Sequence, residues 1–140
     1  MNVGPELLGT HTINGRPVRF YCPPTAGPDF PWFSLDDLLL ALKLSRQARR
    51  HIARLAREDW GEYLTTAMCE GSIITVAPHF VAQGLLDALI STGQITQSAS
   101  DGYYEAGVSV MKELTGHLSP QDLLPWAAEA LRRNDVGGPE

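Results

Sequence analysis

The sequence predicts an α+β domain, with two β-hairpins, a helix-turn-helix-like pair between them and further helices at the C-terminus. Three observations carry this prediction: an Asn-Gly pair between two strand-like segments, a leucine stripe at helical spacing, and a second run rich in β-branched residues. A chain of 140 residues fits a single domain. We expect that domain to span residues 1–134, followed by a disordered tail over residues 135–140.

The first hairpin is predicted around Asn14-Gly15, which separates the segments THTI and VRFY. Asn-Gly tolerates the positive φ angles of a type I′ turn, the usual two-residue connection between antiparallel strands. The next segment, PPTAGPDFP, is rich in proline and glycine, so we expect an irregular loop there. The rings of Phe30, Trp32 and Phe33 are expected to cover the edge of the core.

Two helices should follow, each beginning at a serine. Ser34 and Ser45 are predicted N-caps, because a serine hydroxyl can accept a hydrogen bond from a free N–H of the first turn. Asp36 and Asp37 complement the positive end of the first helix dipole. The second helix is expected to end near Arg57. Four leucines keep the i, i+3, i+4, i+7 spacing of a buried face in the first helix: Leu35, Leu38, Leu39 and Leu42.

A second hairpin is predicted from YLTTAM and SIITVA, with Glu70-Gly71 as its turn. Pro78 can occupy the first turn of the helix that follows, and Gly93 is the expected stop. The expected buried face of this helix consists of Phe80, Val81, Leu85, Ala88 and Leu89.

The C-terminal part, residues 102–133, is predicted to be a helical pair after a polar connector over residues 94–102. The first helix of the pair should span residues 103–115, with these residues inward: Tyr104, Gly107, Val108, Met111 and Leu114. The second should begin at Ser119-Pro120, a cap followed by a proline at the first helical position. Its expected inward residues are Leu123, Leu124, Ala127 and Leu131.

The charge of the chain is concentrated on one element. Residues 43–57 hold six of the eleven basic residues and no acid, whereas the other 125 residues have a net charge of −11. At about 100° per residue, one side of this helix is apolar and comprises Ala48, Ile52, Leu55 and Ala56. The other side carries Arg46, Arg49, Arg50, Arg54 and Arg57. The basic run is therefore predicted to be one face of a packed amphipathic helix.

The string PWFSLDDLLLALKLS resembles the Bro-N domain of phage antirepressors and viral Bro proteins. The matching positions are Pro31, Trp32, Phe33, Asp37, Ala41 and Leu42, followed by Arg49, Arg50, His51 and Ile52, and more loosely by Gly84, Leu85, Ala88, Leu89 and Ile90. Lys43 stands where the family usually has glycine. The resemblance covers about residues 10–95 and implies a DNA-binding or regulatory domain of phage or mobile-element origin.

Several other classes of site are not expected. The four histidines lie far apart in the chain and have no Glu or Cys at ligand spacing, so no metal site is predicted. No cofactor or catalytic motif is found, and the chain is predicted not to be an enzyme. No apolar stretch is long enough to cross a bilayer, and we expect a cytoplasmic protein. Cys22 and Cys69 are expected to be buried thiols.

The leading functional prediction is nucleic-acid binding through the arginine-lined helix, by a homodimer. Arginine pairs with phosphates and can bond guanine edges at two points. The predicted contact residues are Lys43, Arg46, Arg49, Arg50, His51, Arg54 and Arg57. Two alternatives stay open: the same face docks an acidic protein partner, or it is a solvated face that pairs with the acidic remainder of the chain.

Overall fold

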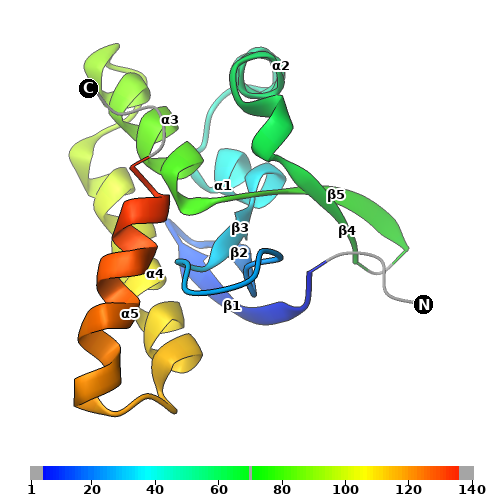
Figure 1. Ribbon diagram of the computed structural model, residues 1–140. Coiled ribbons are helices and arrows are strands. Elements are labelled where there is room, and N and C mark those ends of the chain that lie inside the picture. The colour runs from blue at the N-terminus through cyan, green and yellow to red at the C-terminus, as the bar shows by residue number, and fades with distance from the viewer. Residues whose placement is uncertain (1–4, 70, 136–140) are drawn as a thin grey trace.

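A computed structural model describes residues 5–69 and 71–135, and within them one five-stranded antiparallel sheet packs against helices (Figure 1). The predicted α+β class is confirmed. The strands are β1 (Leu7–Ile13), β2 (Arg16–Tyr21), β3 (Trp32–Ser34), β4 (Thr65–Cys69) and β5 (Ser72–Ala77). The helices are α1 (Leu35–Ala41), α2 (Arg46–Trp60), α3 (His79–Ser91), α4 (Gln97–Thr115) and α5 (Pro120–Arg133), with a short 3-10 turn, η1 (Gly61–Tyr63). The strand order is β1-β2-β3-β5-β4.

Both predicted hairpins are present. Asn14 and Gly15 have φ angles of 51° and 80°, as a type I′ turn requires, and β1 pairs with β2 from Ile13 opposite Arg16. β4 and β5 form the second hairpin, with Gly71 at φ 81° in its turn. Glu70, the other predicted turn residue, lies outside the described residues. The first strand of this hairpin, β4, begins at Thr65 rather than at residue 63, because residue 63 belongs to η1.

The prediction that the aromatic rings before α1 cover the edge of the core is wrong for two of the three. Trp32 and Phe33 form β3, the middle strand of the sheet, and Phe33 is fully buried. Phe33 pairs with Phe20 of β2 on one side and with Ala77 of β5 on the other. Phe30 stays in the preceding loop. The three-residue strand is defined by these long-range pairings, which the local sequence does not show.

The start of α1 compensates for the shortness of β3. Ser34 caps the helix as predicted, since its hydroxyl accepts a hydrogen bond from the Asp37 N–H at 3.1 Å. Beyond the end of β3, the Asp36 carboxylate accepts from the Thr75 N–H of β5 at 3.0 Å. Asp37 accepts from the Arg19 N–H of β2, also at 3.0 Å. These two aspartates therefore accept hydrogen bonds from backbone N–H groups of β2 and β5, the strands that flank β3. This is in addition to their predicted interaction with the helix dipole.

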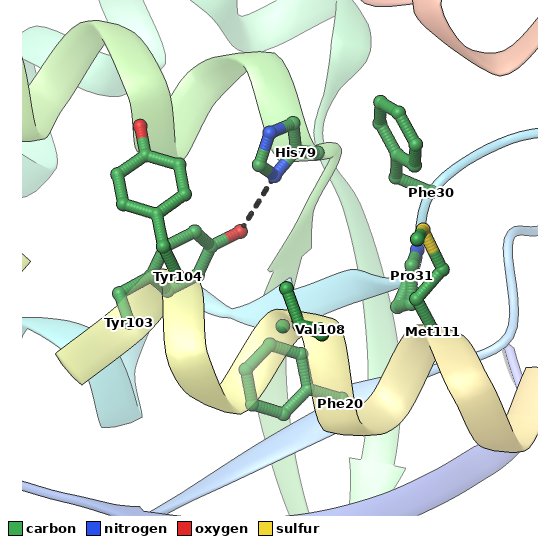
Figure 2. A pocket seen from close by; sticks show the side chains of 9 residues that line it. Phe20, Phe30, Pro31, His79, Tyr103, Tyr104, Val108 and Met111 are labelled. Carbon is green, nitrogen blue, oxygen red and sulfur yellow. Dashed lines mark hydrogen bonds between the residues drawn. The ribbon is translucent and has the colours of Figure 1, made fainter. Parts of the chain in front are cut away.

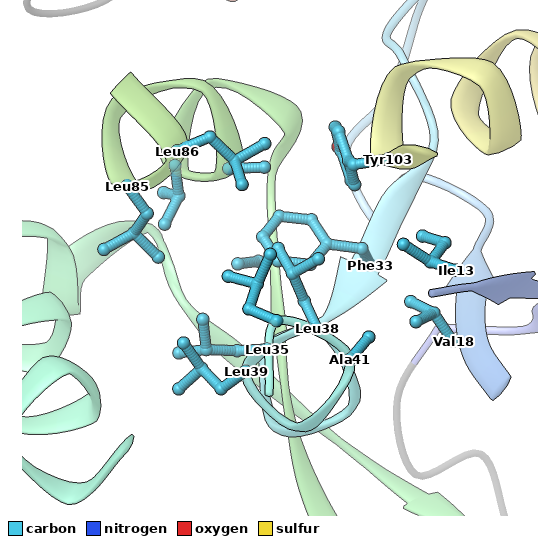
Figure 3. Close-up of a cluster of buried hydrophobic side chains, with 14 of the residues drawn as sticks. Ile13, Val18, Phe33, Leu35, Leu38, Leu39, Ala41, Leu85, Leu86 and Tyr103 are labelled. Carbon is cyan, nitrogen blue, oxygen red and sulfur yellow. The ribbon is translucent and has the colours of Figure 1, made fainter. Parts of the chain in front are cut away.

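The main core lies where α1, α3 and α4 pack against the sheet (Figure 3). All four leucines of the predicted stripe in and after α1 are buried, as expected. Tyr103, Ala106 and Val110 of α4 belong to the same buried cluster, so α4 shares the core of the preceding elements. In Figure 1, α3, α4 and α5 lie along one flank, and the β4–β5 hairpin extends away from the other side.

α3 follows its prediction with two corrections. It ends before Gly93, which has a φ of 74° just after the cap residue, as expected for a helix stop. Pro78 is the N-cap rather than a residue of the first turn, and Ala88 is exposed rather than inward. The remaining predicted core residues of α3 are buried or half-buried.

α4 differs from its prediction in both start and orientation. It begins at Gln97, six residues before the expected position, because Thr96 caps it by accepting from the Ala99 N–H. The predicted polar connector is therefore mostly helical. Gly102 faces β1 closely, since an added Cβ would lie 3.3 Å from Cγ2 of Ile13. With the helix in this orientation, Tyr103 is buried in the core. The predicted inward residues of α4 lie to one side of that core, and Val108 among them is 50% exposed.

α5 begins as predicted, with the Ser119 hydroxyl accepting from the Asp122 N–H at 3.2 Å. Its predicted inward face is wrong: three leucines are exposed, and Ala130 is the buried residue of this helix. Those leucines are Leu123, Leu124 and Leu131. Only one narrow side of α5 meets the rest of the described chain, and helical periodicity does not reveal which side that is.

The end of α5 is held to the loop before β3. Asn134 donates from Nδ2 to the buried carboxylate of Asp29 at 2.8 Å, and its Oδ1 accepts from the Phe80 N–H at 3.1 Å. Asp29 also accepts from the Trp32 indole at 3.0 Å. These bonds order the chain through Asn134. Of the predicted disordered tail, residues 136–140 lie outside the described residues.

Among the described residues, no helix combines the length and apolarity needed to cross a membrane. Cys22 is a free, half-buried thiol, and its burial raises the pKa of the thiol. The side chain of Cys69 lies outside the described part of the structure.

Candidate nucleic-acid interface

The turn between α1 and α2 has the predicted cap at its second helix. The Ser45 hydroxyl accepts a hydrogen bond from the Ala48 N–H at 3.1 Å. α2 then runs to Trp60, three residues beyond the expected end. Lys43, in the turn, has a φ of 58°, a left-handed conformation that favours glycine.

The anchored side of α2 is narrower than predicted. Ile52 and Ala56 are buried in the core and Ala48 is half-buried, but Leu55 is 39% exposed. α2 packs against α1, and η1 follows it directly in the chain. At its end, the Trp60 ring approaches α3 so closely that a Cβ on Gly84 would lie 3.0 Å from it.

The predicted basic face lies on the opposite side of α2 and is largely exposed. The exposed residues of this basic face are Lys43, Arg46, Arg50, His51, Arg54 and Arg57. Arg54 donates from Nη2 to Nδ1 of His51 at 3.0 Å. Because a guanidinium can only donate, this contact uses His51 Nδ1 as the acceptor.

Arg49 is set apart from the other predicted contact residues. Its side chain is half-buried, and Nη1 donates to the Leu44 carbonyl oxygen at 2.9 Å. The bond ties the first turn of α2 back to the interhelical turn. The charge of Arg49 still contributes to the basic face. Its hydrogen bond to the Leu44 carbonyl also stabilises the turn, a role that helical spacing alone did not reveal.

The basic face has no carboxylate partner among residues 5–69 and 71–135. The ion pairs found there involve His11 with Glu113, Arg19 with Asp37, and both Arg132 and Arg133 with Glu129. None of these pairs includes a residue of α2. The alternative of an arginine face paired with the acidic remainder of the chain therefore lacks support in the described residues.

Two open grooves run along α2 and meet at Arg50. One, of about 460 Å³, lies between α1 and α2 and is lined by Asp36, Leu39, Leu40, Arg49, Arg50, Ala53 and Arg57. The other, of about 800 Å³, is lined by Ser45, Arg46, Gln47, Ala48, Arg50, His51, Arg54 and Gln94. Five arginines thus line these two grooves, and Asp36 is the only residue with a carboxylate among their lining residues.

In the described ranges, no three His, Cys, Asp or Glu side chains come together as a metal site would require.

A scan against models of protein families, a search of curated proteins and a search of solved structures each find no match to this chain. The resemblance to the Bro-N domain remains a prediction that rests on the matching sequence positions.

Proposed function

We propose that this protein is a nucleic-acid-binding regulatory protein that docks the arginine face of α2 on double-stranded DNA. The observation that carries the proposal is an exposed set of arginines without carboxylate partners among the described residues, on a helix anchored through Ile52 and Ala56. A rigid helix holds its charges at fixed spacing, so little ordering of the protein is needed when phosphates bind. We also propose that the protein is cytoplasmic and that it is not an enzyme.

The spacing of the arginines suits a phosphate backbone. Arg46, Arg50 and Arg54 follow one another at four-residue intervals, which are about 6 Å along a helix axis. The major groove is about 12 Å wide and admits an α-helix. In this arrangement the exposed arginines contact phosphates along the groove edge, and Lys43 adds a charge at the turn. Arg49 orients the helix through its bond to the Leu44 carbonyl.

The test is fluorescence anisotropy on a labelled random-sequence duplex over a range of salt concentrations. The logarithm of affinity should fall linearly with the logarithm of salt, with a slope of about −0.9 for each phosphate neutralised. The double variant Arg50→Ala/Arg54→Ala should make the slope shallower by about two units. The control, Arg16→Ala/Lys112→Ala, changes the net charge equally at two exposed sites outside α2 and should keep the slope. Absence of wild-type binding at low salt would sink the proposal.

The second candidate function is docking of an acidic peptide. It is favoured by the groove between α1 and α2, which has an apolar floor of Leu39, Leu40 and Ala53 beside Arg49, Arg50 and Arg57. An amphipathic acidic helix would match both features. Leu40→Ser separates the two functions, because it removes apolar surface from the groove without changing the net charge. It should weaken peptide docking and leave the affinity for DNA unchanged.

The proposed homodimer forms through α5. Leu124 and Leu131 are 76% and 61% exposed. Because they are seven residues apart, their side chains point in directions that differ by only about 20° around the helix axis. A two-fold interface requires a self-complementary patch, and antiparallel pairing of two α5 helices places Leu124 of one copy opposite Leu131 of the other. Light scattering after gel filtration should give a dimer for the wild type and for Ile73→Asp, and a monomer for Leu124→Asp. A monomeric wild type contradicts the dimer without affecting the DNA proposal.

A further inference from the structure

A cavity of about 210 Å³ lies between the start of α3, α4 and the loop before β3 (Figure 2). Aromatic rings form most of its wall, contributed by Phe20, Phe30, His79, Tyr103 and Tyr104. Pro31, Gly107, Val108 and Met111 complete it. No residue of the basic face lines this cavity, so it is separate from the proposed DNA surface.

The apolar stripe of α4 faces this cavity. Tyr104, Gly107, Val108 and Met111 keep i, i+3, i+4, i+7 spacing, the pattern that normally marks a buried helix face. Here Tyr103, on the adjacent side of the helix, enters the core, and the stripe is left lining open space with Val108 50% exposed. Leaving apolar surface in water is unfavourable by about 25 cal/mol per Å². A molecule filling the cavity would cover the stripe.

The wall restricts the chemistry of that molecule. No aspartate, glutamate, lysine or arginine lines the cavity, and burial lowers the pKa of His79, which keeps the imidazole neutral near pH 7. His79 is held in place, because its Nδ1 is 3.0 Å from the Tyr103 hydroxyl and the two rings stack at 16°. Burying an unpaired charge here would be very costly. Flat walls of aromatic rings favour a ring-shaped guest.

We propose that the cavity binds a small uncharged aromatic molecule of one or two rings. The size fits, since an apolar protein cavity of about 150 Å³ holds benzene. The proposal is independent of DNA binding and goes beyond it by adding a ligand site in the same domain.

Gly107 offers a direct way to close the site. A Cβ added there would meet no heavy atom within 4 Å, because the space beside it is the cavity itself. A Cβ at this position therefore displaces no neighbouring atom, and a larger side chain there would take up room that the guest needs. Gly61, at the junction of α2 and η1, is equally unhindered but lies outside the cavity wall, so the same substitution there is a matched control.

The probe is 5-fluoroindole, observed by fluorine NMR as the protein is titrated. We expect broadening and a shift that saturate with a Kd of roughly 0.1–1 mM, as for a fragment of about ten heavy atoms. Gly107→Leu should weaken binding by at least about tenfold, while Gly61→Leu should leave it unchanged. The charged analogue 4-fluorobenzoate should bind at least about tenfold more weakly than the indole.

A fold check keeps the test decisive. If Gly107→Leu does not fold, Gly107→Ala adds a single methyl group to open space and should weaken binding about two- to threefold. Saturable binding that persists in a folded Gly107→Leu would overturn the proposal, and so would the absence of binding by the wild type at millimolar probe. Probe binding that decreases as protein concentration rises would show that a second copy fills the cavity, which would also overturn it.

Discussion

The Asp37 carboxylate accepts three hydrogen bonds from Arg19. Oδ2 accepts from the backbone N–H at 3.0 Å and from Nε at 2.6 Å, and Oδ1 accepts from Nη2 at 2.8 Å. The side chains are 12% and 25% exposed, so the pair is largely shielded from solvent. One residue of α1 thus holds both the backbone and the side chain of a β2 residue, which fixes the helix that precedes the arginine-lined α2.

Removal of this carboxylate should weaken the fold. Asp37→Ala leaves the Arg19 N–H and guanidinium without this acceptor, and we expect a loss of about 2–3 kcal/mol in the free energy of unfolding. Asp37→Asn keeps one acceptor oxygen and should cost less, about 1–2 kcal/mol. Asp36→Asn is the neighbouring control. Asp36 is exposed and accepts one bond from Thr75, so we expect about 1 kcal/mol or less. Urea denaturation measures all three, and equal losses for Asp36→Asn and Asp37→Ala would contradict this account.

Lys43 should be strained by its left-handed backbone. A non-glycine residue in this conformation costs about 1 kcal/mol, so Lys43→Gly should raise the free energy of unfolding by about 0.5–1 kcal/mol. Lys43→Ala keeps a Cβ and should give no such gain. Both substitutions remove the same charge, and the proposed DNA contact predicts the same small loss of affinity for each. Denaturation and anisotropy on the two variants therefore separate the backbone effect from the charge effect. A gain in stability for both variants would rule out strain as the cause.

His79 should make stability depend on pH. Burial is the main cause of its lowered pKa, partly opposed by the nearby carboxylate of Asp29. In the unfolded chain the imidazole titrates near its ordinary pKa of about 6.5. Above that pH both states are neutral, and the full stability is present. Below it the unfolded state takes up the proton first, so the free energy of unfolding falls as pH decreases.

The measurement is urea denaturation between about pH 5 and pH 7, above the range where most carboxylates titrate. His79→Gln should flatten the decline in stability, whatever its effect on stability at pH 7. His117→Gln, at an exposed position, serves as the control and should keep the wild-type slope. A slope that is unchanged in His79→Gln would assign the pH dependence to other groups.

The local elements of the fold could be predicted because their causes lie within a few residues. The turn at Asn14-Gly15 depends on two φ angles, and the starts of α1, α2 and α5 depend on a serine hydroxyl and an N–H three residues on. The amphipathic character of α2 follows from helical spacing, and its arginines are exposed with the exception of half-buried Arg49. These interactions need no information about the rest of the chain.

The rotation of α4 and the outward side of α5 could not be predicted in the same way. Both helices carry apolar residues on more than one side, so periodicity leaves several orientations open. The close approach of Gly102 to Ile13 directs Tyr103 into the core, and the predicted stripe then lines a cavity. The tether between Asn134 and Asp29 spans more than one hundred positions in sequence, and no local pattern marks it.

By itself, then, the sequence determined the α+β class, the hairpin turns, the starts of α1, α2 and α5 and the concentration of positive charge on α2. Only the tertiary structure decided that residues 32–34 form the central strand, that Arg49 bonds the interhelical turn, and that the stripe of α4 faces an aromatic cavity. The physical reason is range. Caps, turns and helical spacing act over about four residues, whereas strand neighbours, helix rotation and cavities depend on contacts between residues far apart in the chain.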